Sequence, residues 1–148
     1  MKTLTLAASL ALSLAVAAPA VQAQAAAAPI GLEQATRIAQ QAGYGAVRGA
    51  ELDDGVWDVL ASGADGRRVT VHIDAATGDI LWPAQPGQRQ LGIDEVMARL
   101  AAAGYTEVQE LERDDGFWTA EVRTSMGFER DVRVHPITGA VEVERWDD

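Results

Sequence analysis

Two histidines, His72 and His135, are the side chains of this sequence best suited to proton transfer near neutral pH or to binding a transition metal. Apolar and polar residues alternate around His72, and this alternation places its ring away from the core, between the inward-facing Val71 and Ile73. We therefore expect both histidines to be polar surface residues rather than ligands, and we predict no metal site.

Nucleophilic catalysis has few candidate residues. After residue 23 the sequence contains two serines, Ser62 and Ser125, both near predicted turns and neither within a G-x-S-x-G motif. A catalytic triad would require Ser125 and His135 to converge on an acid that no motif identifies. Cysteine is absent and the only lysine is Lys2, in the predicted signal peptide, so the exported chain has no thiolate or Schiff-base chemistry. We predict a protein without enzyme activity, catalytic residues or a bound cofactor.

Paired aspartates precede a glycine at two places, residues 53–55 and 114–116. Such carboxylates could hold calcium, but the sequence lacks a D-x-[DN]-x-[DN]-G loop, and an Asp-Gly turn forms without metal. Nothing around these solvated tips would raise one carboxyl pKa as glycoside hydrolysis requires. We interpret both sites as hairpin turns, for which Asp-Gly supplies the positive φ angles.

These turns belong to a repeat, because the sequence matches itself at a gapless offset of 61 residues. A period of this length indicates two copies of one supersecondary unit. The matching positions are mostly glycines, turn-forming residues and large apolar residues, which a fold needs and which carry little chemistry. In the first copy they are Gly31, Gly43, Tyr44, Val47, Glu51, Asp53, Asp54, Gly55, Trp57, Gly66, Val71, Thr77 and Gly78.

Each copy begins with a helical pattern and continues with alternating strands. Apolar residues recur at helical spacing over residues 32–42 and 93–103, and each stretch lies between two glycines. After each helical stretch, apolar residues recur at every second position, as in a strand with one buried face. Trp57, Trp118 and Phe128 each begin such a series of residues that we expect to face the core. We predict an α+β fold of two repeats, in each of which one helix packs on a three- to four-stranded antiparallel β meander.

The order of segments predicts an exported protein. Residues 1–23 have the layout of a secretory signal peptide, with a short basic start, an apolar run too short to span a bilayer well, and small residues before the expected cleavage site. Residues 24–29 form a flexible Ala-rich segment. Residues 30–82 are the first repeat, residues 83–90 a linker with prolines and glycine, and residues 91–148 the second repeat. We expect a periplasmic or secreted protein.

Acidic residues dominate the charge, because 22 Asp and Glu face 12 Lys and Arg, for a formal net charge of -10. Binding to the phosphates of a nucleic acid requires clustered basic residues, so we expect no nucleic-acid partner. No later stretch approaches about 18 consecutive apolar residues, so we expect no membrane insertion after signal cleavage. The charge favours a basic partner.

Apolar residues on the sheet face opposite the helix, or at strand and chain ends, are candidate contacts for a protein or peptide partner. Trp57 and Trp118 are not among them, because their register places them against the helix. The alternative for these candidates is burial between the two repeats, and the sequence leaves both possibilities open. The candidate partner-binding residues are Val56, Leu60, Trp82, Phe117 and Trp146.

The chain resembles the PepSY domain in its helix, in the acidic hairpin before a Trp-bearing strand, and in a closing segment, residues 74–80, that reads Asp-Ala-Ala-Thr-Gly-Asp-Ile. The matching segment of the second copy is residues 135–141, where His135 and Pro136 replace the aspartate and the first alanine. The resemblance covers both copies and implies an exported tandem PepSY protein. PepSY domains occur in propeptides of secreted metalloproteases and in envelope proteins, with a suggested role in binding and restraining proteases, and the resemblance implies no catalytic residue.

The resemblance and the surface together predict an exported, non-enzymatic module that binds a protein or peptide, with restraint of a protease in the cell envelope as one expected form. Such a module would use the open face or an edge strand of a sheet. The alternative is an envelope domain that senses a small molecule or a metal in the cleft between the repeats.

Overall fold

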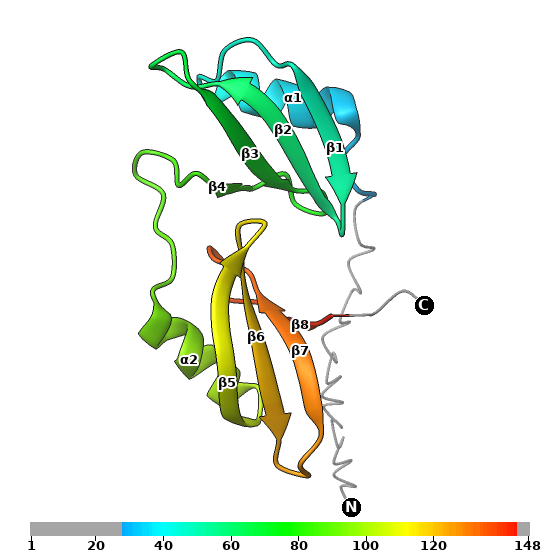
Figure 1. Ribbon diagram of the computed structural model, residues 1–148, viewed down its shortest axis with the longest axis vertical. Coiled ribbons are helices and arrows are strands. Elements are labelled where there is room, and N and C mark those ends of the chain that lie inside the picture. Colours follow the sequence, from blue (N-terminus) through cyan, green and yellow to red (C-terminus); the bar gives the residue numbers. More distant parts are fainter. Residues whose placement is uncertain (1–27, 145–148) are drawn as a thin grey trace, which may run out of the picture.

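The computed structural model describes residues 28–144, which form two α+β units that follow one another along the chain (Figure 1). The predicted signal peptide, most of the Ala-rich segment and Trp146 lie outside the described residues. The first unit contains α1 (Leu32–Gln41), β1 (Gly49–Asp53), β2 (Val56–Ser62), β3 (Arg68–Asp74) and β4 (Ile80–Trp82). The second unit contains α2 (Ile93–Ala102), β5 (Tyr105–Asp114), β6 (Phe117–Thr124), β7 (Glu129–Val134) and β8 (Val141–Val143).

Each unit consists of one helix packed on one face of a four-stranded antiparallel sheet. The strands follow chain order in both sheets, β1-β2-β3-β4 and β5-β6-β7-β8, so each sheet is a meander. Helix α1 contacts β2 and helix α2 contacts β5, and Figure 1 shows each helix on one side of its own sheet. The predicted fold class is confirmed, with four strands in each repeat.

Glycines mark the ends of both helices, as the sequence predicts. Gly31 and Gly92 are the N-caps, and in α2 the Glu95 carboxylate accepts a hydrogen bond from the Gly92 N–H at 3.1 Å. Gly43 and Gly104 follow the helices with φ of 92° and 94°. Both helices have ten residues, and within the described part of the chain no helix is long and apolar enough to cross a membrane.

Two-residue turns connect the first two strands of each sheet. Asp54 and Gly55 have φ of 41° and 79°, and Asp115 and Gly116 have φ of 44° and 86°. Positive φ at both central positions is typical of the type I′ turn, whose twist matches that of the flanking strands. The predicted Asp-Gly hairpins are therefore present, and Figure 1 shows both tips at the ends of the sheets that face the other unit.

Each helix and sheet enclose a separate hydrophobic core. Trp57 and Trp118 pack at equivalent places in the two cores, and their Nε1 atoms donate hydrogen bonds to the carbonyl oxygens of Ile30 and Leu91 at 2.9 and 3.2 Å. Phe128 is 53% exposed and precedes β7, so the prediction that it begins an inward-facing set is wrong. The buried residues of the cores are Ala35, Ala39, Val59, Val71, Ile73 and Ile80 in the first unit and Leu91, Val96, Leu100, Ala120, Val122, Val132 and Val134 in the second.

A third hydrophobic cluster joins the two units. It consists of Val56, Leu81 and Phe117, of which Val56 and Phe117 occupy equivalent positions directly after the hairpin tips. A Cβ atom at Gly116 would lie 2.6 Å from the Cβ of Leu81, so only glycine permits this close approach of the tip to β4. The two units are therefore packed against each other at the ends of their sheets.

The segment between the units, residues 83–90, is bound to the first unit by glutamine side chains. The Nε2 atom of Gln85 donates to the Tyr44 hydroxyl at 2.9 Å, and the Nε2 atom of Gln90 donates to the Leu81 carbonyl at 2.7 Å. These bonds fix both ends of the segment. They hold the start of α2 in a defined place relative to the first sheet.

Candidate functional site

The contacts between the repeats are reciprocal. His72 Nδ1 lies 3.9 Å from Asp115 Oδ1, while Arg133, at the position equivalent to His72, donates from Nη1 to the carbonyl oxygen of Asp54 at 2.9 Å. Asp54 is in turn equivalent to Asp115. Reciprocal contacts of this kind are typical of two subunits related by a twofold axis. The fold thus creates two geometrically similar sides of one junction, and the sequence gives them different chemistry.

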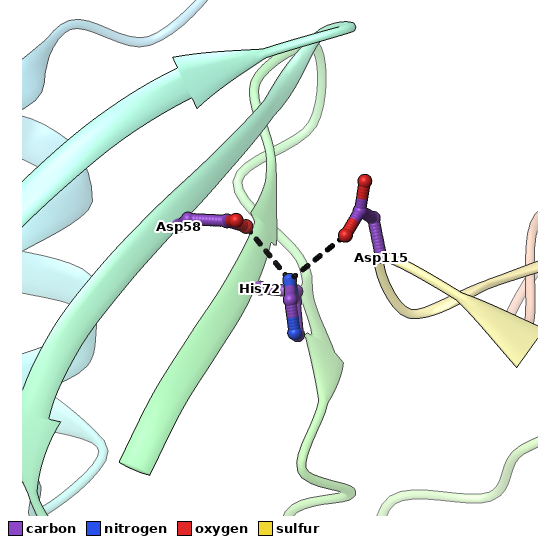
Figure 2. A group of neighbouring side chains, drawn as sticks. All are labelled: Asp58, His72 and Asp115. Carbon is purple, nitrogen blue, oxygen red and sulfur yellow. Dashed lines mark hydrogen bonds and ion pairs between the residues drawn. The ribbon is translucent and has the colours of Figure 1, made fainter. Parts of the chain in front are cut away.

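One side of the junction gathers Asp58, His72 and Asp115, which we call the His72 cluster (Figure 2). Asp58 lies on β2, His72 lies opposite it on β3, and Asp115 lies at the tip between β5 and β6. The Asp58 Oδ1 atom accepts a hydrogen bond from His72 Nδ1 at 2.7 Å, and one ligand atom from each residue lies within 4.8 Å of the others. All three side chains are half-buried. The cluster therefore combines groups from both repeats.

Asp115 carries its charge in an unfavourable place. Burial raises the pKa of its carboxyl group, and the nearby Asp114 and Asp58 carboxylates raise it further, while His72 partly opposes them. The His72 cluster thus contains more negative charge than its one imidazole can balance.

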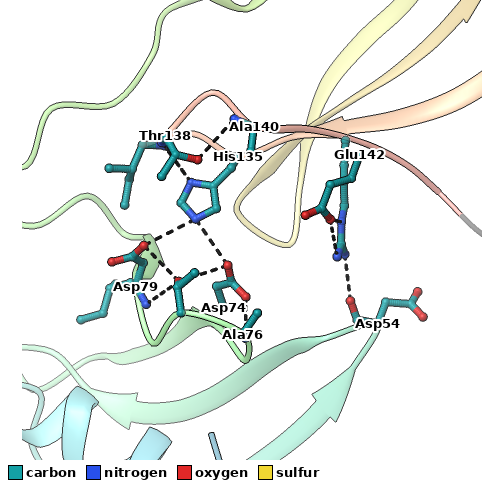
Figure 3. Close-up of polar contacts among 12 residues, drawn as sticks. Asp54, Asp74, Ala76, Asp79, His135, Thr138, Ala140 and Glu142 are labelled. Atoms are coloured by element: carbon teal, nitrogen blue, oxygen red, sulfur yellow. Dashed lines mark hydrogen bonds and ion pairs between the residues drawn. The ribbon is translucent and has the colours of Figure 1, made fainter. Parts of the chain in front are cut away.

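The other side of the junction is occupied by Arg133. Its guanidinium carbon lies 4.6 Å from the centre of the Phe117 ring, and its Nε and Nη2 atoms each lie 3.1 Å from Glu142 Oε2. Together with the bond to the Asp54 carbonyl, these contacts place a permanent positive charge against the hairpin tip of the first repeat (Figure 3). On this side of the junction, the Arg133 side chain supplies the positive charge.

Between these sides, His135 of the second repeat faces Asp74 of the first, at the equivalent position (Figure 3). The Nδ1 atom of His135 accepts the N–H groups of Ile137 and Thr138, each at 3.2 Å, so the ring proton must be on Nε2. Nε2 points toward Asp74 Oδ2 at 3.4 Å and Asp79 Oδ2 at 3.6 Å, which is longer than a normal hydrogen bond.

Asp74 and His135 perform the same task in their own turns. The Asp74 Oδ1 atom accepts the N–H of Ala76 at 2.8 Å, as the imidazole does for Ile137. Burial opposes ionisation of Asp74, but the contact with His135, the Ala76 N–H and the Thr77 hydroxyl favour the ionised form and lower its pKa. His135 accepts backbone N–H groups through Nδ1 and also presents its Nε2–H to Asp74 across the junction. A second aspartate at position 135 would instead place a carboxylate against that of Asp74.

The expectation that both histidines are surface residues is wrong. His135 is only 6% exposed, and the His72 side chain is only 18% exposed. The period-two pattern does place His72 away from the helix-covered core, but that face meets the other repeat. Among the described residues, the ion-pair partners of the two histidines are carboxylates, at Asp58 and Asp115 for His72 and at Asp74 and Asp79 for His135.

A second polar feature is an acidic pocket of about 190 Å³ on the open face of the second sheet, which we call the acidic face. Glu121 on β6 pairs across the sheet with Glu110 on β5 and with Asp131 on β7, so three carboxylates stand in one row. Like charges directly opposite each other destabilise a sheet. The residues lining the pocket are Glu110, Glu112, Asp114, Thr119, Ala120, Glu121, Asp131 and Glu144.

No ion pair within 4.0 Å among the described residues includes a carboxylate of this row. Arg123 and Arg133 lie on the same strands but pair with Glu107, Glu129 and Glu142 instead. The pocket's negative charge is also evident at Glu144, where burial and the neighbouring Asp131 raise the carboxyl pKa. In the first repeat the positions equivalent to Glu121 and Asp131 are Leu60 and Thr70, so the fold itself does not require acids there.

The candidate partner-binding residues have different environments. Val56 and Phe117 are buried in the junction, 2% and 5% exposed, so burial between the repeats is the alternative that the structure adopts for them. Leu60 is half-buried on the open face of the first sheet. Trp82 is 49% exposed, and the Arg113 guanidinium lies between its ring and that of Trp118, 5.6 and 4.9 Å from the two ring centres.

The fold and the candidate sites together define a class: a duplicated α+β protein with clusters of charged residues at the junction between its repeats and an acidic pocket on one open sheet face. Residues 2–82 match the family model described as the peptidase propeptide and YPEB domain, PepSY_2. This match spans more than half of the chain, so the chain belongs to the PepSY_2 family. Domains of this family are propeptide- or inhibitor-like modules, generally non-catalytic and typically extracellular or periplasmic.

The family match covers only the first repeat and its preceding segment. The second repeat has the same order of one helix and four strands, and we propose that it is a second PepSY domain. No curated protein and no solved structure matches the chain.

Proposed function

We propose that this protein is an exported, non-enzymatic PepSY module that binds a basic segment of another protein through the acidic face of its second sheet. Membership of the PepSY_2 family favours restraint of a protease as the result of this binding. The observation that carries the proposal is the row of Glu110, Glu121 and Asp131, three carboxylates side by side on neighbouring strands without a basic partner among the described residues.

The energetics of this row support a role in binding. Adjacent like charges reduce the stability of the sheet, and the first repeat forms the same sheet with Leu60 and Thr70 at two of the equivalent positions. A segment rich in arginine or lysine would neutralise the row while it covers the open face. Opposite charges also accelerate association and orient the partner before contact.

A neutralised double variant, Glu121→Gln with Asp131→Asn, tests the proposal. The purified protein and the variant are assayed as inhibitors of a panel of secreted metalloproteases, at low and at physiological salt. We expect the wild-type protein to slow at least one protease, and the variant to inhibit it about tenfold less, because two exposed ion pairs contribute roughly 0.5–1 kcal/mol each. The variant should also melt at a higher temperature, since the repulsion within the row is removed.

The matched control is Glu33→Gln with Glu51→Gln, which changes the net charge equally on two exposed residues of the first repeat. It should inhibit as the wild-type protein does. Equal weakening by both double variants would show that only net charge matters. A wild-type protein that inhibits no protease in the panel would reject restraint of a metalloprotease, and inhibition untouched by the face variant would place binding elsewhere.

A further inference from the structure

The two sides of the junction differ in where positive charge comes from. On one side, the Arg133 guanidinium lies against the tip of the first repeat and is held by Glu142 and the Asp54 carbonyl. On the equivalent side, His72 replaces the arginine and Leu81 stands at the position equivalent to Glu142. The imidazole is shorter than a guanidinium side chain. Its Nδ1 atom lies 3.9 Å from Asp115 Oδ1, too far for a direct hydrogen bond.

The side of the junction that carries His72 also has one carboxylate more than the side that carries Arg133. Asp58 faces His72 across the strand pair, whereas the position equivalent to Asp58 in the second repeat is Thr119. The imidazole of His72 therefore stands between the carboxylates of Asp58 and Asp115. No arginine of the described chain forms an ion pair within 4.0 Å with either of them.

We propose that Asp58, His72 and Asp115 bind a divalent transition-metal ion of the first row, which joins the two repeats at the place where Arg133 joins them on the other side. Two carboxylates and one imidazole are a ligand set of the zinc type. Waters would complete the coordination shell. The site shares no residue with the acidic face, and its test does not depend on the partner of that face.

The geometry fits such an ion. Ligand atoms of a tetrahedral site with bonds of about 2.1 Å lie about 3.4 Å apart. The observed separations from His72 Nδ1, 2.7 Å to Asp58 and 3.9 Å to Asp115, lie on either side of this value, and small side-chain rotations would equalise them. Figure 2 shows Nδ1 between the two carboxylates and the other ring nitrogen turned away. Metal binding would displace the proton that Nδ1 donates to Asp58, and the other ring nitrogen would carry the ring proton of the neutral imidazole.

The second histidine is unsuited to the same role. Its Nδ1 atom already accepts two backbone N–H groups, so Nε2 must keep the ring proton and has no lone pair for a metal. His135 is therefore an internal control for His72. Calcium and magnesium are also poor candidates for the His72 cluster, because both prefer shells made only of oxygen.

Because Asp58 and His72 belong to the first repeat and Asp115 to the second, the ion would stabilise their packed arrangement. A ligand that binds only the folded state raises stability by RT ln(1 + [L]/Kd). We expect Zn²⁺ at 100 times its Kd to raise the melting temperature of the purified protein by roughly 5–10 °C.

The experiment is a titration of the purified protein, first stripped with EDTA, with Zn²⁺, Mg²⁺ and Ca²⁺ by calorimetry and thermal melting. One Zn²⁺ should bind per chain, and His72→Gln and Asp115→Asn should each weaken binding by about tenfold or more. Asp54→Asn is the matched control, since it makes the same change in the equivalent turn, and it should leave zinc binding unchanged. Long-range ¹H–¹⁵N spectra should show zinc shifting Nδ1 of His72 and neither nitrogen of His135.

Several outcomes would overturn the proposal. They are a wild-type protein that does not bind zinc, zinc binding of full strength in both His72→Gln and Asp115→Asn, and a zinc-induced shift at His135 rather than His72. Calcium binding as tight as zinc binding and insensitive to His72→Gln would likewise replace it with a purely acidic site. Should His72→Gln fail to fold, Asp115→Asn decides by itself, because asparagine tolerates the positive φ of this turn.

Discussion

The two repeats use the same residues to fold and different residues where they face each other and the solvent. Trp57 and Trp118 make the same hydrogen bond in the two cores, and the Asp-Gly turns have the same backbone geometry. In contrast, Asp74 faces a histidine at its equivalent position, and His72 corresponds to an arginine. The turn glycines and the core tryptophans are identical in the two repeats and the other core positions stay apolar, whereas several charged positions at the junction have diverged.

A comparison of the two repeats within this one chain can therefore separate residues that the fold requires from residues that serve another purpose. A residue shared by both repeats is explained by the fold that they share. A residue present in only one repeat, such as His72 or Glu121, requires a separate physical reason. Both sites combine residues of the two kinds. The His72 cluster adds the unshared Asp58 and His72 to the shared Asp115, and the acidic face adds the unshared row of Glu110, Glu121 and Asp131 to shared acids.

The strongest test of the shared positions is to truncate the tryptophans. We expect Trp57→Ala and Trp118→Ala each to lower the free energy of unfolding by about 3–5 kcal/mol, because each removes a large ring from a core and leaves a carbonyl without its donor. Urea denaturation of both variants measures the two losses. A difference between them larger than about 2 kcal/mol would contradict the equivalence of the two cores.

A change at a diverged position tests the opposite claim. His135→Asp would restore the residue of the first repeat and place two carboxylates against each other at the junction. We expect a loss of about 2 kcal/mol at pH 7, because a buried charge would face a like charge without compensation. His135→Asn is the control, since its amide oxygen can accept the Ile137 N–H without adding charge, and it should lose clearly less.

The same pair predicts a pH dependence. The pKa of Asp74 is lower in the folded protein than its ordinary value of 3.8, so its ionised form contributes stability above pH 3.8, and this contribution is lost as pH falls through the folded pKa. The deficit of His135→Asp should therefore shrink on acidification from pH 7 to pH 4, as one of the two facing carboxyl groups takes up a proton. Melting curves across this range measure it, and a constant deficit would show that packing, not charge, disfavours aspartate.

The smallest expected effect distinguishes the two hairpin tips. In EDTA at pH 7, Asp115→Asn should raise the free energy of unfolding by at most about 0.5 kcal/mol, because the ionised Asp115 is disfavoured in the folded state. This penalty is present above the raised pKa and disappears below pH 3.8. Asp54→Asn has the same turn geometry without the His72 cluster and serves as the control, and an equal gain in both variants would indicate turn preference alone.

Local features of the fold could be predicted from the sequence because short-range physics determines them. Glycine spacing identified the helix ends, Asp-Gly the hairpins, and alternation the register of Trp57 and Trp118. Phe128 was mispredicted because β7 begins only at Glu129, after the turn at Met126 and Gly127.

The junction could not be predicted, because its contacts depend on how two separately folded units pack. Alternation correctly placed His72 opposite the helix-covered face, but it could not indicate that the tip carrying Asp115 lies there. The same alternation predicts that His135 faces away from the helix, next to the inward-facing Val134, and it could not indicate that the other repeat buries this residue. Val56 and Phe117 were recognised as apolar residues in need of cover, and only the arrangement of the repeats shows that each helps to cover the other.

The unlike pair at positions 74 and 135 also bears on self-association. Two first repeats docked in this manner would bring carboxylate against carboxylate, and two second repeats would bring ring N–H against ring N–H. Docking is therefore disfavoured between two copies of the same repeat and favoured between a first and a second repeat. If chains exchange halves at high concentration, each exchanged junction must therefore join the first repeat of one chain to the second repeat of another, which preserves the native pairing of Asp74 with His135.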